Sequence, residues 1–266
     1  MMERLDASIR RQLLLDDRDI VGKPFPLEGN TARFVQANTR HLTLLLLDTD
    51  IKNRASRAAA FAANLMDASI AHHLKETIAC ARGCPYCCTT YVSTSLPEVF
   101  RMARAVRGNA PTTERVNTAA ARTKAMPQLQ REVTRVICPI LDNNACSQYD
   151  VRPMVCRVVM STSLESCVRI FTQSANEPFA APKSLDALRS YLMIILRTAL
   201  VLAGLPHKHY ELAHALEIAL ADPDSEERWL AGEPIFEPVA VDRLDLTDSP
   251  ISNLVNVLVG AVRPTI

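Results

Sequence analysis

The stretch CARGCPYCC, residues 80–88, holds four of the eight cysteines of this 266-residue chain. The others follow singly as Cys138, Cys146, Cys156 and Cys167, and the rest of the chain has none. Structural core thiols would be scattered more evenly, so we interpret this cluster as a set of thiols that serve one purpose. Cysteine-rich constellations of this kind form either disulfides or metal sites.

The N-terminal sequence helps to choose between disulfides and metal. Residues 1–19, MMERLDASIRRQLLLDDRD, are charged throughout and lack the apolar stretch of a secretory signal. The longest apolar run, residues 44–47, is far too short to cross a bilayer. We therefore expect a cytoplasmic protein that does not enter the membrane. Because thiols stay reduced in the cytosol, clustered cysteines there bind metal or act in catalysis more often than they form disulfides.

The composition is that of an ordinary globular chain, with 48% hydrophobic and 22% charged residues. The net charge of +1 argues against general binding to nucleic acid or to membrane surfaces. Residues 98–135 nevertheless hold eight Arg or Lys and three Glu, whereas residues 206–250 hold eleven Asp or Glu and three basic residues. These segments form either two solvated faces, which could face each other, or a basic groove for an acidic partner.

Few glycines and many Ala and Leu residues predict a mostly α-helical protein with an irregular, cysteine-rich metal-binding centre. Apolar periodicity and breaker residues place the expected helices. They lie within 36–79, at 95–107, at 112–135 with a break at Pro127, at 184–204, at 207–221, from 224, and at 251–262.

Two of these helices carry clear boundary signals. Ser95 and Glu98 have the spacing of a capping box at the first helix turn. Ser184 is expected to cap the helix that stops at Gly204. The apolar positions of that helix follow a helical period and are Leu185, Leu188, Leu192, Ile195, Ala199 and Leu202.

Residues 138–182 are rich in Cys, Pro, Asn, Asp and Ser, which predicts irregular loops with short helical or extended pieces and one strand-like run at 155–160. Such a segment buries too little apolar surface to order itself, and a thiolate-bound metal would supply the missing free energy. The chain therefore divides into an N-terminal helical region (1–75), a cysteine-cluster metal-binding region (76–170) and a C-terminal helical region (171–266). We expect the three to form one compact unit.

Two shorter motifs in the cluster are typical of other protein classes. The spacing Cys80-x3-Cys84-x2-Cys87 is that of radical S-adenosylmethionine enzymes, which carry it after the first strand of a βα barrel. The tetrapeptide CPYC is the active-site motif of glutaredoxins, which require a strand before it and a helix N-terminus that lowers the thiol pKa. Here a helical pattern precedes the motif and no alternation of strands and helices follows.

The spacing instead favours a metal-binding turn. Gly83 and Pro85 interrupt the preceding helix, so the sulfurs of Cys84 and Cys87 can converge on one ion. Adjacent side chains diverge, so Cys88 indicates a second metal, a multinuclear cluster, or a role other than ligation.

Two separated blocks of sequence together resemble a known family. The segment ICPILDNNACSQYDVRPMVCR (137–157), taken with CARGCPYCC and VSTSLPEVF (92–100), is similar to the CxxCxxCC cysteine-cluster family, described as zinc- or iron-chelating proteins. The resemblance covers residues 75–170, and Cys167 fits its pattern less closely than the rest. It implies a ligand set of Cys80, Cys84, Cys87, Cys88, Cys138, Cys146 and Cys156.

Other residues near the cysteines have candidate supporting roles. Arg152 and Arg157 could donate N–H groups to metal-bound thiolates, although Arg152 could equally pair with a carboxylate such as Asp150. His72 and His73 precede Cys80 by about two helical turns and could complete a coordination shell. The alternative for these histidines is a packed or solvated position.

Seven or eight thiolates exceed one tetrahedral zinc and suit two zinc ions or one iron–sulfur cluster with spare thiols. An all-sulfur set disfavours magnesium and calcium. The family resemblance favours iron–sulfur, as a 4Fe–4S cluster, over zinc. We predict a metal-binding protein that acts in chelation, delivery, sensing or a metal-stabilised interaction with a protein partner. The alternative is an iron–sulfur enzyme for redox or group transfer, for example protein methylation, because the family remotely includes flagellin lysine-N-methylases.

Overall fold

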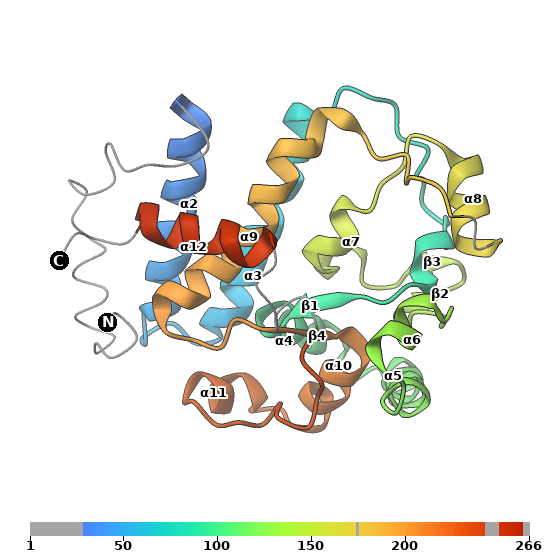
Figure 1. The fold of residues 1–266 in the computed structure, drawn as a ribbon. Helices are drawn as coiled ribbons and strands as arrows, with labels where there is room; N and C mark the ends of the chain where they lie inside the picture. The colour runs from blue at the N-terminus through green and yellow to red at the C-terminus, as the bar shows by residue number, and fades with distance from the viewer. Residues whose placement is uncertain (1–28, 174–175, 243–249, 263–266) are drawn as a thin grey trace.

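The computed structural model describes residues 29–173, 176–242 and 250–262 and is mostly helical (Figure 1). Its α-helices are α2 (Gly29–Leu47), α3 (Arg54–His73), α4 (Leu96–Val106), α5 (Ala110–Thr123), α6 (Gln128–Val133), α7 (Met154–Val158), α8 (Leu164–Thr172), α9 (Asp186–Ala203), α10 (Leu212–Ala221), α11 (Ser225–Leu230) and α12 (Pro250–Val262). None of these described helices is both long and apolar enough to cross a bilayer. The prediction of a mostly α fold is confirmed.

Strands and 3-10 helices are short and few in the described residues. The 3-10 helices are η3 (Tyr86–Thr89), η4 (Tyr149–Val151) and η5 (Lys183–Leu185). Strand β1 (Ser93–Ser95) pairs antiparallel with β4 (His209–Glu211), so that Ser93 lies opposite Glu211. Strands β2 (Leu141–Asp142) and β3 (Ala145–Cys146) form a small antiparallel hairpin. These two ribbons position segments of the cysteine region.

The main core lies among α2, α3, α4, α9, α10 and α12. α2 packs along α9, α12 crosses α9, and α3 packs between α9 and α4. Apolar side chains such as Leu42, Met66, Phe100 and Ile195 are fully or almost fully buried there. Figure 1 shows α2, α9 and α12 on one side of the molecule, and α6, α8 and the β2–β3 hairpin on the other.

Several local sequence signals act as expected. α4 begins with a complete capping box, in which the Glu98 carboxylate accepts the backbone N–H and hydroxyl of Ser95 at 3.1 and 2.7 Å. Pro127 separates α5 from α6. α9 ends where Gly204 adopts φ 72°, a left-handed conformation that favours glycine. α12 covers the last predicted helix.

Other expectations are corrected by long-range contacts. The predicted strand at 155–160 is wrong, because residues Met154–Val158 form α7. The predicted helix at 207–221 starts only at Leu212, since residues 209–211 pair with β1 instead. Ser184 lies in η5 ahead of α9, and its hydroxyl donates to Glu76 rather than capping the helix.

Candidate metal centre

Three of the first four cysteines, Cys84, Cys87 and Cys88, follow a tight turn that runs into η3. Gly83 has φ 88°, in the left-handed region where a side chain would be strained. The Cys84 N–H donates to Ala81 O at 3.1 Å, and the Cys88 N–H donates to Pro85 O at 2.9 Å. The chain therefore reverses before Cys84 and then coils once through Cys87. This agrees with the turn inferred from Gly83 and Pro85.

The segment that carries Cys138 lies directly against this turn. The Cys138 N–H donates to Cys88 O at 2.7 Å, and the Val136 N–H donates to Thr89 O at 3.1 Å. The β2–β3 hairpin then places Cys146 opposite Leu141. Its turn uses two asparagines with positive φ, a conformation that asparagine tolerates better than most residues. Backbone pairing thus brings two distant cysteines beside the first block.

Cys156 is placed by α7, a helix of five residues whose start is fixed by Glu98. The second oxygen of the Glu98 carboxylate, Oε1, accepts the Met154 N–H at 2.7 Å, and the side chain is 6% exposed. One buried carboxylate therefore caps α4 with one oxygen and α7 with the other. This explains why residues 154–158 are helical despite their β-branched character. The capping box was visible in the sequence, but this second contact was not.

Cys80 and Cys167 approach the turn from another direction. The Ala79 N–H donates to Ser161 O at 2.8 Å, and the Ser161 N–H donates to the Cys80 sulfur at 3.4 Å. Ser161 is fully buried, and its hydroxyl donates to the carbonyl of Ser163 at 3.0 Å. α8, which packs on η3, carries Cys167 in a buried position. Ser161 therefore holds the chain around Cys80, a role that the sequence did not reveal.

The thiols influence one another electrostatically, and these influences define one connected set. Cys80 is affected by Cys84, Cys87 and Cys167. Cys156 is affected by Cys87, Cys138 and Cys146. Cys87 also neighbours Cys88 and Cys146. Cys87 thus lies between two groups, with Cys80, Cys84 and Cys167 in one and Cys138, Cys146 and Cys156 in the other.

Burial and neighbouring thiols raise the pKa of five of these cysteines and so disfavour their thiolates. Burial raises the pKa of Cys138 to about 11. Burial also raises the pKa of Cys156, of Cys146 and of Cys80. A hydrogen bond with Cys88, together with burial, raises the pKa of Cys87. A bound cation reverses this balance, because a coordinating thiol is deprotonated.

All eight cysteines are free thiols. Among the described residues, no three His, Cys, Asp or Glu side chains converge closely enough to hold a metal ion. The structure therefore gathers the predicted cysteines into one region without drawing them to one point. The donor set itself, made of soft sulfur atoms, fits zinc or iron–sulfur chemistry.

The two arginines differ in what they touch. The Arg157 side chain is almost fully buried and donates to Asp67, to Asp150 O at 2.7 Å and to Arg152 O at 3.1 Å. It therefore ties the segment before Cys156 to α3. Arg152 stacks on the Tyr149 ring at 3.6 Å. Burial raises the pKa of the Cys146 thiol, and the positive charge of Arg152 lowers it by a smaller amount. Direct N–H donation from either arginine to sulfur stays a prediction.

The two histidines considered from the sequence lie at the end of α3. The side chains of His72 and His73 are exposed, and their rings make an edge-on contact with centroids 4.7 Å apart. Their proposed part in a coordination shell stays a prediction.

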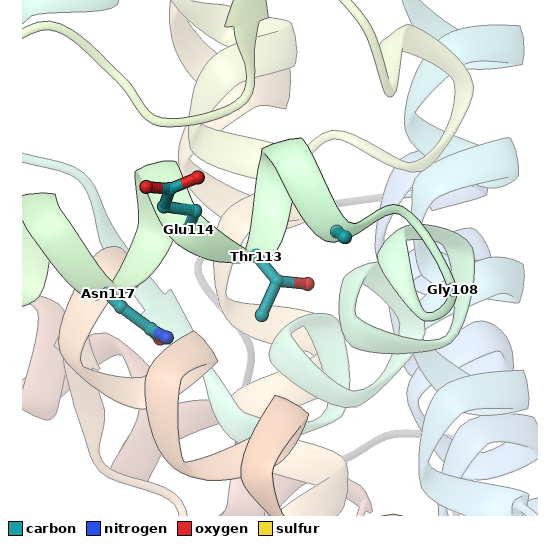
Figure 2. Close-up of a pocket in the computed structure, with 5 residues that line it drawn as sticks. Gly108, Thr113, Glu114 and Asn117 are labelled. Atoms are coloured by element: carbon teal, nitrogen blue, oxygen red, sulfur yellow. The ribbon is translucent and has the colours of Figure 1, made fainter.

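An open depression lies away from the cysteines, at the junction of α4 and α5. Figure 2 shows its lining residues, which are Gly108, Ala110, Thr113, Glu114 and Asn117. Its volume is about 530 Å³. The lining includes one carboxylate and no thiol or imidazole, so this depression offers no sulfur ligand to a metal.

The comparison with protein families agrees with the geometry. Residues 79–181 match the family CxxCxxCC, whose description is "Putative zinc- or iron-chelating domain". The match starts one residue before Cys80 and extends past Cys167, so it contains all eight cysteines. No curated protein and no solved structure matches the chain. The resemblance drawn from the two cysteine blocks is thereby confirmed.

Proposed function

We propose that this protein binds zinc or iron through the thiolates of its cysteine cluster, because residues 79–181 match the CxxCxxCC family. The observation that carries the proposal is the connected set of eight free thiols, which three separate chain segments bring together. Together with burial, neighbouring thiols raise the pKa of Cys80, Cys87 and Cys156, and a bound cation would offset this effect by stabilising the thiolates.

The two groups of thiols suggest how the ligands are shared. The first group is Cys80, Cys84 and Cys167, and the second is Cys138, Cys146 and Cys156, with Cys87 adjoining both. Cys88 contacts Cys87 directly. This division suits two metal ions or one cluster with spare thiols. Bound metal would supply electrostatic stabilisation of the thiolates, and with it order in residues 138–182.

Iron–sulfur, as a 4Fe–4S cluster, is the form that we propose, with zinc as the competing occupant. The role follows from the ligands. A site in which cysteine fills every metal position favours storage, delivery, sensing or a metal-stabilised interaction over catalysis at an open metal position. Arg152, whose charge already favours the thiolate of Cys146, would offset part of the negative charge of such a site.

Anaerobic purification followed by elemental analysis and a visible spectrum tests this function. We expect iron and acid-labile sulfide in a coloured protein. A colourless protein with stoichiometric zinc would contradict the iron–sulfur form and keep the chelating function. A folded protein that contains eight free thiols and no metal would contradict the chelating function as well.

A further inference from the structure

α6 is oriented with its charged side inward and its apolar side outward. Arg131 is the buried residue of this helix and is 5% exposed, whereas Leu129 and Val133 are 62% and 76% exposed. Residues four apart lie on the same face of a helix, and Arg131 lies between them on the opposite face. Ile137, which follows the helix, is 65% exposed. We call Leu129, Val133 and Ile137 the apolar edge.

An ion pair holds α6 in this orientation. Arg131 Nη2 lies 3.1 Å from Glu211 Oε1, and both side chains are buried. Arg131 Nη1 donates to Thr134 O at 3.3 Å, whereas its Nε is buried and has no partner within the described residues. Burying such a pair carries a desolvation cost that apolar contacts would avoid. This orientation pairs Arg131 with Glu211 and leaves the apolar edge exposed.

The segment after α6 also turns an apolar side chain outward. The N–H groups of Val136 and Cys138 bond to the turn that carries the first cysteines, and Val136 is buried. Alternation along this extended stretch turns Ile137 outward. Of the large hydrophobic side chains that are exposed in the described residues, all but Val257 fall within residues 129–164. Within the described residues, the exposed large apolar side chains are therefore concentrated in the sequence of the cysteine region.

Positive charges outnumber negative ones around α6 in the sequence, where Arg122, Lys124 and Arg135 flank the helix and Glu132 is its one carboxylate. Arg122 and Lys124, just before α6, are exposed, and their side chains make no hydrogen bond or ion pair within the described part of the chain. Arg135, just after it, lies over the Phe171 ring at 5.6 Å. A second copy docked symmetrically would set this positive surface against itself. Three apolar side chains are also far fewer than the 20–30 residues a side, roughly, that a stable dimer interface uses.

We propose that the apolar edge docks a segment of a partner protein that presents apolar side chains flanked by carboxylates. The carboxylates would face Arg122 and Lys124, and the apolar side chains would cover Leu129 and Val133. This inference stands on α6 and its surroundings and does not depend on which metal the cysteines bind.

Fluorescence anisotropy with a synthetic peptide tests the proposal on the full-length protein. The probe is a labelled amphipathic peptide with leucines on one face and glutamates on the other. A second peptide has lysine in place of each glutamate. We expect the acidic peptide to bind, to weaken with added salt, and to bind L129S/V133S at least about tenfold more weakly than wild type. Val257→Ser, which removes an exposed apolar side chain elsewhere, should bind as wild type does.

Three results would overturn the proposal. They are equal binding of the acidic and basic peptides, unchanged binding to L129S/V133S, and a wild-type dimer in sedimentation that Val133→Ser converts to monomer. Because Leu129 and Val133 are exposed, their loss should leave the melting temperature nearly unchanged. R122E/K124E gives a second test that spares the apolar side chains, and it should also lose the acidic peptide. Retained binding by this variant would contradict the charge argument.

Discussion

The helices around α9 and the cysteine region are held together by different interactions. α2 and α9 pack through apolar side chains such as Leu42 and Ile195, which are fully buried. In the described part of residues 138–182, the same core takes in three side chains, which are Ile140, Met154 and Val158. The cysteine region relies on single polar contacts instead.

These polar contacts are few and each fixes one segment. Glu98 holds α7, Arg157 ties the loop before Cys156 to α3, and Ser161 closes around Cys80. A region held in this way has little apolar burial to lose, so we expect its order to depend on bound metal far more than that of the helical region does. Substitutions in each region test this difference.

The largest effect should come from the cysteine that adjoins both groups of thiols. Cys87→Ser removes the thiol that is coupled to both groups, so on the proposed ligand set we expect the purified protein to lose most of its metal. Cys167→Ser removes a thiol that affects Cys80 and should cost less metal. Elemental analysis of the two variants measures the difference. Equal metal content in Cys87→Ser and wild type would remove Cys87 from the ligand set.

A change in the helical region should act on the whole fold and leave the ligands intact. Ile195 is fully buried in α9, so Ile195→Ala should destabilise the protein by about 2–5 kcal/mol, and Ile195→Val by about 0.5–1.5 kcal/mol. The metal content of the folded protein should not change. Thermal unfolding measures the stability, and elemental analysis measures the metal content. A variant that loses metal but keeps its stability would contradict the contrast between the two regions.

Loss of Glu98 should act on the cysteine region through one helix. Glu98→Ala leaves the Met154 and Ser95 N–H groups without their acceptor, which should cost about 1–3 kcal/mol. Hydrogen exchange should rise in α7 more than in α9. Glu98→Gln keeps one acceptor oxygen but places its NH2 group against the other backbone N–H. The stability of this variant should therefore lie between those of Glu98→Ala and wild type. Unchanged exchange in α7 would show that Glu98 does not hold that helix.

The smallest effect concerns pH and the contact between the chain before Cys80 and η5. Hydrogen bonds from the Ser184 hydroxyl and backbone N–H lower the pKa of Glu76 from 4.5 to about 2. The stabilisation is therefore complete above the ordinary pKa and disappears as pH falls toward 2. Hydrogen exchange of η5 should rise over that range in wild type and be insensitive to it in Glu76→Gln. Glu114→Gln, on the open depression, serves as the control.

Sequence signals that act within a few residues predicted the fold well. The capping box of α4, the break at Pro127 and the stop at Gly204 each depend on neighbours in the chain. The elements that were predicted wrongly have hydrogen-bond partners that are far away in the sequence. α7 is helical because of a carboxylate 56 residues earlier, and Ser184 bonds a glutamate 108 residues earlier. The orientation of α6, with Arg131 inward and its apolar side outward, depends on Glu211, which lies 80 residues after Arg131.

The candidate site shows the same limit. The cysteine pattern and the family resemblance located the thiols, because spacing and type are properties of the sequence. Which thiols neighbour each other, and that Cys87 lies between two groups, required the backbone pairing of residues 136–138 with the first turn. The positions of Arg157 and Ser161 likewise depend on contacts across the fold.

Hydrogen exchange by mass spectrometry, before and after anaerobic metal removal with a chelator, tests the central claim most directly. We expect residues 138–173 to lose protection on metal removal while α9 keeps it, because only the cysteine region depends on thiolate ligands for its order. Identical exchange in both regions before and after chelation would contradict the account.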